Sequence, residues 1–226
     1  MLRDEADLHH TLGTVYVEQG RYARAAEAYQ RSTDLRHQAG DLTGLARSFN
    51  NLALTAWSQG DLNGARDYLQ RSLEINQQIG DNYGLAFGYN NLGAVSYTAG
   101  DAEGALNYYH VAFSLRQRIG DNYGLAQTAS NIAEAYLRLT QYDEARRYLQ
   151  QAAALFEKMQ SEAELPEVYS LLAEVALARS NIDLALVHAE RARDIAETVG
   201  NPVLQGIAER GLARAQAQHG DDVQAR

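Results

Sequence analysis

Apolar residues recur at steps of three and four along the chain. In the first half of residues 41–80, Leu45, Phe49, Leu52 and Ala56 mark one face, which is the spacing of an amphipathic α-helix. The second half carries another stripe of the same kind, and Gly60-Asp61 lies between the two stripes. The pattern predicts two antiparallel helices of about 17 residues each, or about 25 Å at 1.5 Å per residue.

The same pattern returns every 40 residues. The seven residues from Gly80 to Ala86 recur letter for letter from Gly120 to Ala126. A marker leucine or isoleucine keeps the same period, at Leu12, Leu52, Leu92, Ile132, Leu172 and Leu212. A fixed period of this length is typical of repeat arrays, in which each unit packs on its neighbours. We expect a single array over residues 1–226, with units 1–40, 41–80, 81–120, 121–160, 161–200 and a partial unit 201–226.

Gly-Asp pairs mark the predicted helix ends. Glycine takes the left-handed conformation that closes a helix, and the aspartate that follows can accept a backbone N–H of the next first turn. Such pairs stand at residues 40–41, 60–61, 80–81, 100–101 and 120–121. Pro166 predicts a helix that begins near Glu164, because proline is tolerated in a first turn. A break at Gly220 would leave the chain one turn into a second helix, which we interpret as the cut end of a longer protein.

Small residues stand at fixed places in each unit. The residue after the marker is glycine or alanine, as at Gly13 and Gly93, and a second position is always alanine, as at Ala105. A bulky side chain there would force paired helices apart, so the pattern predicts close packing. Gly44 and Gly84 lie in a first turn, where glycine costs up to about 1 kcal/mol relative to alanine. We infer that a neighbouring group comes close to them.

These small residues carry a resemblance to a known family. Leu12-Gly13-x-x-Tyr16 followed by Ala25-x-x-x-Tyr29 resembles the tetratricopeptide signature. The usual unit is about 34 residues with a proline near its end, whereas these units are longer and lack that proline. The chain is therefore similar to the long-repeat type of kinesin light chains, Pins-type adaptors and bacterial regulators. The resemblance implies an all-α fold, a right-handed α-solenoid of antiparallel helix pairs with five full repeats and a partial sixth.

Composition narrows the possible functions. The net charge is −9, so nucleic acid is not expected as a direct partner. The chain has no cysteine for a thiol nucleophile or a thiolate site, and no apolar run that could span a membrane. The charged start lacks the apolar core of a signal peptide, so we expect a cytoplasmic protein. Adjacent His9 and His10 do not face one another on a helix, and Lys158 is the single lysine, so we expect no metal, no cofactor and no enzyme activity.

The resemblance places function on a concave groove lined by the first helix of each pair. Asn51, Asn91 and Asn131 stand in register there, where asparagine in family members often bonds the backbone of a bound peptide; alternatively these side chains bond a neighbouring helix. Trp57, Phe87 and Tyr97 form either a binding patch on this groove or part of the core between repeats. The peptide-binding candidates are Arg47, Asn50, Asn51, Leu54, Trp57, Phe87, Asn90, Asn91, Tyr97, Gln127, Asn131, Glu134 and Arg138.

Two functions follow from this interpretation. The first is a protein–protein interaction scaffold that binds a peptide segment of a partner in the concave groove. The cationic clamp that some relatives use for a C-terminal carboxylate is missing, since the matching positions include His10, Thr14 and Asn51. The alternative is a sensory or regulatory module of a larger bacterial signalling or transcription-regulator protein, in which the repeats contact other domains of the parent chain.

Overall fold

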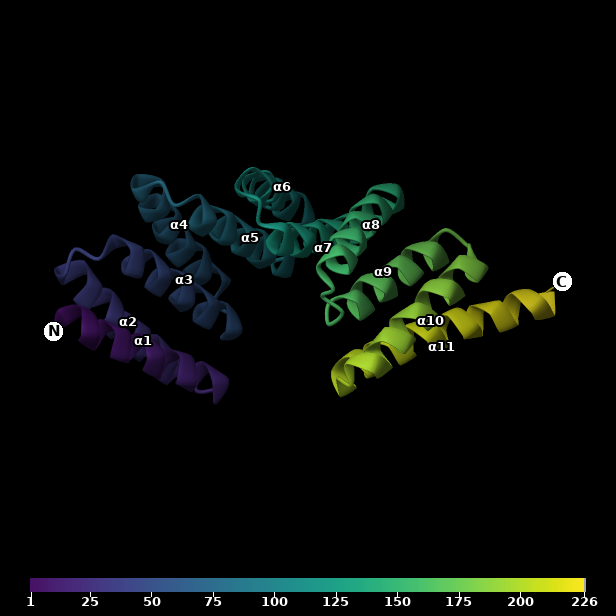
Figure 1. Ribbon diagram of the computed structural model, residues 1–226, viewed down its shortest axis with the longest axis horizontal. Helices are drawn as coiled ribbons and strands as arrows, with labels where there is room; N and C mark the ends of the chain where they lie inside the picture. Colours follow the sequence, from purple (N-terminus) through teal and green to yellow (C-terminus); the bar gives the residue numbers. More distant parts are fainter. Residues whose placement is uncertain (226) are drawn as a thin grey trace. The chain divides into compact units, whose positions relative to one another are not determined.

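The computed structural model describes residues 1–225, with the backbone alone for residues 221–225. Every regular element in that part of the chain is a helix, so the predicted all-α solenoid class is confirmed. The chain forms two compact units, residues 1–119 and the residues from 120 on (Figure 1). The helices are α1 (Leu2–Glu18), α2 (Tyr22–Gln38), α3 (Leu42–Ser58), α4 (Leu62–Ile79), α5 (Asn82–Thr98), α6 (Ala102–Ile119), α7 (Asn122–Arg138), α8 (Tyr142–Met159), α9 (Leu165–Ala178), α10 (Ile182–Val199) and α11 (Pro202–Ala225).

The helix ends follow the predicted capping chemistry. Oδ1 of Asp41 accepts the backbone N–H of Gly44 at 3.1 Å, and Asp81 and Asp121 cap α5 and α7 in the same way. Gly40 and Gly80 have the left-handed φ values of 64° and 72° that close the preceding helices. Three helix ends without glycine adopt the same conformation, at Thr140, Gln160 and Ser180. Helix α9 begins as predicted, with Glu164 as its N-cap and Pro166 in its first turn.

The first unit is a stack of three helix pairs. Helices α1 and α2, α3 and α4, and α5 and α6 pack as pairs, and α3 and α5 also pack on the preceding helices α2 and α4 (Figure 1). The core between the second and third pairs contains Leu69, Leu73, Leu92 and Val95. Because neighbouring pairs share this core, the second helix of one pair covers the first helix of the next.

The predicted close packing at the small residues is confirmed, and tyrosine rings cause it. A Cβ placed on Gly13 would lie 2.6 Å from the ring of Tyr29, and one on Gly93 would lie 2.5 Å from the ring of Tyr109. Both tyrosines are buried. The glycines therefore make room for a ring of the paired helix.

The first-turn glycines also have close neighbours, as predicted. A Cβ on Gly44 would meet the capping carboxylate of Asp41 and the side chain of Arg36, and a Cβ on Gly84 would meet Asn76. The neighbour is therefore the N-cap or a residue of the preceding helix.

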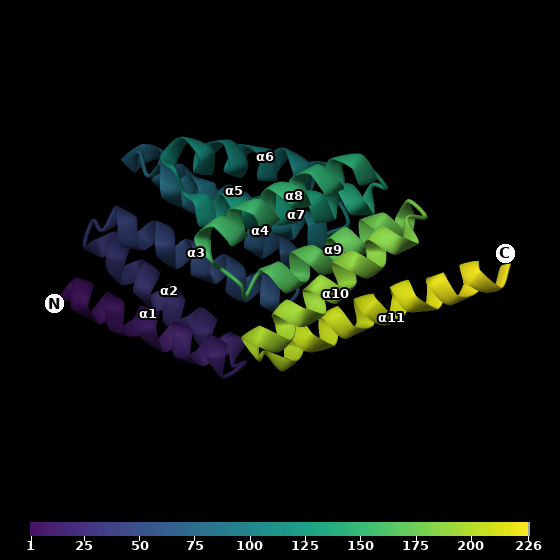
Figure 2. The ribbon, with the colours of Figure 1, turned by 45° about the vertical axis from the view of Figure 1, so that its right-hand side comes forward.

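The second unit contains α7 to α11 (Figure 2). Helices α7 and α8 and helices α9 and α10 pack as pairs, and α11 packs on both α9 and α10. The predicted break at Gly220 is wrong, because α11 continues to Ala225. Glycine and aspartate weaken a helix interior by only about 1 kcal/mol or less per residue relative to alanine, so a helix can run through Gly220 and Asp221.

Arg226, the last residue of the predicted partial unit, lies outside the described residues. The assignment of residues 1–226 to one array stays a prediction. None of the described helices combines the length and the apolar composition needed to cross a membrane.

Candidate functional site

A cavity of about 370 Å³ opens on the first unit between α1, α3 and α5. Helix α4 adds the buried side chains of Ser72 and Asn76 to its wall. Most of the lining residues have polar side chains, including the cation of Arg47, and Tyr83 and Phe87 add aromatic rings. The lining residues are His10, Thr43, Ala46, Arg47, Asn50, Asn51, Ser72, Asn76, Asp81, Tyr83, Gly84 and Phe87.

Four of the residues predicted from the sequence meet in this cavity: Arg47, Asn50 and Asn51 from α3, and Phe87 from α5. They meet because α3 and α5 are first helices of consecutive pairs and present the same face. Phe87 is 40% exposed and presents its ring to the cavity. The other predicted residues lie elsewhere.

Sequence reasoning missed several lining residues, among them Thr43, Asn76 and Tyr83. Tyr83 had a signal, since it belongs to the seven-residue stretch that recurs at Gly120. Helix capping explains the glycine and the aspartate of that stretch but not its tyrosine. No sequence signal indicates Asn76, because it lies on the second helix of its pair and the groove is expected from the first helices.

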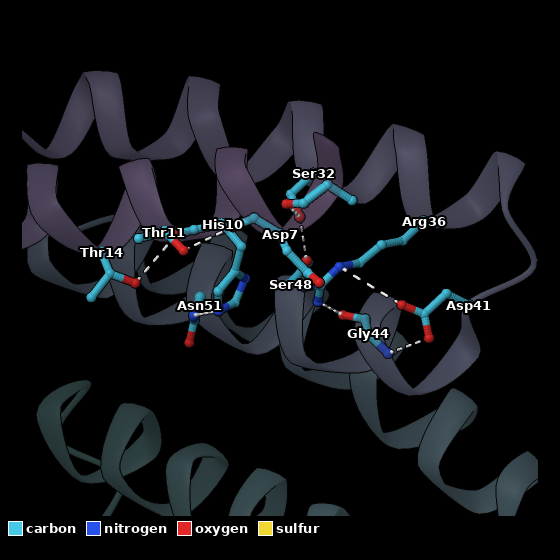
Figure 3. Close-up of polar contacts among 11 residues, drawn as sticks. Asp7, His10, Thr11, Thr14, Ser32, Arg36, Asp41, Gly44, Ser48 and Asn51 are labelled. Carbon is cyan, nitrogen blue, oxygen red and sulfur yellow. Dashed lines mark hydrogen bonds and ion pairs between the residues drawn. The ribbon is translucent and has the colours of Figure 1, made fainter. Parts of the chain in front are cut away.

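The carboxamides of the cavity also link neighbouring helices. Asn91 on α5 donates from Nδ2 to Oδ1 of Asn50 at 3.0 Å, and both side chains are buried. Asn51 on α3 lies with Nδ2 3.2 Å from Nε2 of His10 on α1 (Figure 3). Each bond joins residues 41 positions apart. The alternative interpretation, a bond to a neighbouring helix, therefore describes both pairs, and contact with a peptide stays a prediction.

The electrostatics of the α1–α3 side come from one histidine and two arginines. Burial lowers the pKa of His10, and the charges of Arg36 and Arg47 lower it further. A neutral ring can accept the N–H of Asn51 at Nε2, as the geometry requires, because an amide nitrogen only donates.

Arg36, on α2, links the first two helix pairs. Its guanidinium is buried, forms an ion pair with Asp7 at 2.8 Å and donates to the carbonyl of Gly44 (Figure 3). A buried cation is costly unless it is paired and hydrogen-bonded. Asp7 of α1 and the Gly44 carbonyl of α3 partner its two terminal nitrogens, while its buried Nε has no hydrogen-bond partner among the described residues. Arg36 therefore acts as a structural link between the first two helix pairs.

The remaining predicted residues of the first unit do not line the cavity. Trp57 packs against the core that contains Leu69 and Leu92, as the inter-repeat alternative states. Leu54, Asn90 and Tyr97 are half-buried. Of the three aromatic residues considered for a binding patch, Phe87 alone lines the cavity.

The predicted residues on α7 belong to the second unit. Gln127 and Arg138 are exposed, whereas Asn131 and Glu134 are half-buried. Burial and the neighbouring charge of Glu167 raise the pKa of Glu134 to about 7, against the opposing effect of Arg138. Within the described residues, no group of three or more histidine, aspartate and glutamate side chains could hold a metal ion.

Two family models match most of the chain, and both describe a helical repeat. Models of the tetratricopeptide repeat match residues 4–78 and 84–158, and a second such model matches residues 131–199. The chain belongs to the tetratricopeptide repeat family. Among curated proteins, none matches its sequence.

Three solved structures show the same fold at 17% to 19% sequence identity. A signal-transduction ATPase with a tetratricopeptide repeat sensor from Pyrococcus horikoshii is similar at a TM-score of 0.84 and 18% identity, over 97% of this chain and 34% of that one. Aspartyl phosphate phosphatase F from Bacillus subtilis is similar at 0.87 and 17%, over 98% and 58%. Repeats of a chain assigned as a kinesin light chain in Podospora anserina are similar at 0.71 and 19%, over 86% and 96%. The chain thus spans about a third of the first protein and somewhat more than half of the second.

Proposed function

We propose that the chain is a scaffold that binds a peptide segment of a partner protein across α1, α3 and α5. Tetratricopeptide repeats generally mediate protein–protein interaction and are typically non-catalytic. The observation that carries the proposal is the cavity of about 370 Å³, where amide, hydroxyl and guanidinium groups stand beside the exposed ring of Phe87.

The amides of the cavity suit a peptide backbone. In the described part of the chain, Nδ2 of Asn50 and Oδ1 of Asn51 have no hydrogen-bond partner, while their other amide atoms link α3 to α5 and to α1. One free donor and one free acceptor on adjacent residues match the C=O and N–H of a peptide group. The helix links hold both amides in fixed orientations, which reduces the entropy that binding would cost.

The other lining residues indicate which side chains the peptide would bring. Arg47 is exposed and is the single cation of the cavity lining, so a carboxylate of the peptide is the complementary group. Tyr83 and Phe87 lie four residues apart on α5 and therefore on one face. Both are exposed, and together they offer an apolar surface to a hydrophobic side chain of the peptide.

Peptides selected from a random displayed library against the folded chain provide the test. Isothermal titration would compare the wild type with Arg47→Ala and Phe87→Ala. We expect each variant to bind about 5–30-fold more weakly, equivalent to about 1–2 kcal/mol. Arg66→Ala is the matched control, because Arg66 is exposed on α4 and does not line the cavity. Peptides that bind both cavity variants as tightly as the wild type would contradict the proposal.

A second candidate is a sensory module of a longer regulator. The observation that favours it is the similarity to the repeat sensor of the signal-transduction ATPase, which covers 97% of this chain but 34% of that protein. The full-length gene product separates the candidates. An adjoining ATPase or DNA-binding domain whose activity changes when the selected peptide binds would support the sensory module, and a product without such a domain would contradict it.

A further inference from the structure

The second unit has a groove between α9 and α11, two helices that pack on each other. Its volume is about 280 Å³. Leu171 and Leu177 of α9 and Ile207 of α11 form the apolar part of its lining, and all three are half-buried. We call this space the α9–α11 groove. All of its lining residues belong to the second unit, so it is a separate site from the cavity of the first unit.

The glycine at position 211 leaves this groove open. Gly211 and Ser170 are the counterparts of Asn91 and Asn50, three repeat periods later. In the first unit, the side chain of Asn91 reaches from α5 to α3 and donates to Asn50. Gly211 has no side chain, and a Cβ there would have Oγ of Ser170, at 3.9 Å, as its nearest atom from another helix. The space that a carboxamide fills in the first unit is therefore free in the second.

A helix that paired with α11 would not close the groove. The first unit shows this arrangement, because α6 packs on α5 as such a helix would pack on α11. The cavity between α3 and α5 is open with α6 in place, and no residue of α6 lines it. The α9–α11 groove is therefore a feature of the two helices that form it.

Two opposite charges of the lining have no partner. In the part of the chain whose side chains the structure describes, Glu167 on α9 and Arg210 on α11 form no ion pair. The other two charged lining residues, Glu174 and Arg214, pair with each other at 4.0 Å. The charge of Glu167 raises the pKa of Glu134, so its neighbour on α7 is another carboxyl group and not a cation. One helix thus offers an unpaired carboxylate to the groove, and the other offers an unpaired guanidinium.

We infer that the α9–α11 groove binds a free α-amino acid with an aliphatic side chain. Arg210 donates hydrogen bonds to the carboxylate of the ligand, and its ammonium group donates to Glu167. Oγ of Ser170 can accept from the ammonium as well, because its own proton is donated to the carbonyl of Pro166 at 2.7 Å. The aliphatic side chain takes the space beside Gly211 and lies on the apolar part of the lining.

The size and the charges of the groove favour a free amino acid over a peptide. Its volume lies just below the range of about 300–1,000 Å³ that is usual for small-molecule sites. A residue inside a peptide has lost both its ammonium and its carboxylate to peptide bonds. A free amino acid carries both groups on one carbon, so it can satisfy Glu167 and Arg210 together.

Leucine, isoleucine and valine are the probes, and derivatives of leucine remove one group at a time. Nuclear magnetic resonance on the isotope-labelled chain would show which backbone amides shift on titration. We expect saturable shifts within residues 167–177 and 207–214. Glycine lacks the side chain, N-acetyl-leucine lacks the ammonium and leucinamide lacks the carboxylate, so each should bind about 10-fold more weakly than leucine. Saturable shifts from none of the three probes, or equal binding of an N-acetylated, C-amidated Ala-Leu-Ala peptide, would overturn the inference.

Gly211→Asn tests the space in the groove without removing a contact. The variant should fold, because the nearest atom of another helix is 3.9 Å from the new Cβ and asparagine is a better helix former than glycine. It should lose the leucine shifts, since the new carboxamide occupies the space of the aliphatic side chain. Gly220→Asn is the matched control, because Gly220 lies on the same helix with nothing within 4 Å. Unchanged leucine binding by folded Gly211→Asn would contradict the site.

Two charge variants test the role of each wall. Arg210→Gln should bind leucine and leucinamide equally, and Glu167→Gln should bind leucine and N-acetyl-leucine equally, because each variant lacks the partner of the group that the derivative lacks. Both residues are exposed, so the variants should keep their helical circular dichroism. Variants that discriminate between these ligands as the wild type does would overturn the assignment. Peptide binding in the first unit enters none of these measurements.

Discussion

The side-chain amide of Asn91 donates a 3.0 Å hydrogen bond to Oδ1 of Asn50, and both residues are buried. The bond joins α5 to α3 across two consecutive helix pairs. It also fixes the orientation of Asn50 in the cavity wall. Asn91, which the sequence predicts to contact a ligand, instead orients a residue of the cavity wall.

Replacement of Asn91 by alanine should therefore affect stability more than a surface substitution does. The change leaves the buried oxygen of Asn50 without a donor, which costs about 1–3 kcal/mol. Urea unfolding would measure the free energy of unfolding of Asn91→Ala and of Asn107→Ala, an exposed asparagine on α6. Equal and small losses in the two variants would show that the bond contributes nothing.

The contact between Gly93 and the ring of Tyr109 gives a second prediction. Gly93→Ala would place a methyl group 2.5 Å from a buried ring, so we expect a loss of about 1–3 kcal/mol from overpacking. The equivalent positions hold Ala53 with Leu69, which share one core. The double variant Gly93→Ala with Tyr109→Leu should therefore recover most of the loss in thermal unfolding. Losses that simply add in the double variant would contradict the pairing.

The neutral state of His10 predicts a dependence of stability on pH. Burial and two arginine charges lower the pKa of His10 in the folded protein, so the unfolded chain binds more protons than the folded one below about pH 6.5. Stability should fall as the pH decreases through that value, because a charged ring cannot accept the N–H of Asn51. His10→Gln should lose less stability on acidification, whereas His37→Gln, at an exposed position on α2, should behave as the wild type. Identical acid sensitivity in all three proteins would contradict the argument.

Glu134 predicts the opposite dependence in the second unit. Its pKa is raised to about 7 by burial and by Glu167, so the folded chain binds the extra proton between about pH 4.5 and 7. Stability should fall as the pH rises through that window. Glu134→Gln should then be more stable than the wild type at pH 8, by about 1–3 kcal/mol. The gain should shrink toward pH 5 and be missing in Glu162→Gln, at an exposed position; a gain that does not change with pH would point to another cause.

Most of the fold could be predicted because the signals are local. Gly80 and Asp81 adopt their conformation and cap from neighbours within a few residues, so their letters alone indicate the helix ends. The wrong break at Gly220 has a complementary reason. Gly60-Asp61 and Gly100-Asp101 stand between two helices that pack as a pair, whereas the helix runs through Gly220-Asp221, so these two letters do not end a helix in every context.

The candidate site could be predicted only in part because it depends on how helices pack. The sequence shows Asn51, Asn91 and Asn131 in register, but the pairing of Asn51 with His10 and of Asn91 with Asn50 depends on an offset of 41 residues, one more than the repeat. That offset comes from the position of each first helix against the next. The partial burial of Trp57 and the exposure of Phe87 have the same origin. Both are aromatic residues on first helices, and they differ in the neighbours they meet.

Photocross-linking would locate the bound peptide most directly. A benzoyl-phenylalanine at position 87, on the cavity wall, would be compared with one at position 187, exposed on α10 of the second unit. After irradiation with a library-selected peptide, mass spectrometry would show the site of attachment. We predict a covalent adduct from position 87 and none from position 187, and less adduct in Arg47→Ala at the same peptide concentration. An adduct from position 187, or none from position 87 while the peptide binds with unchanged affinity, would contradict a binding site in the cavity of α1, α3 and α5.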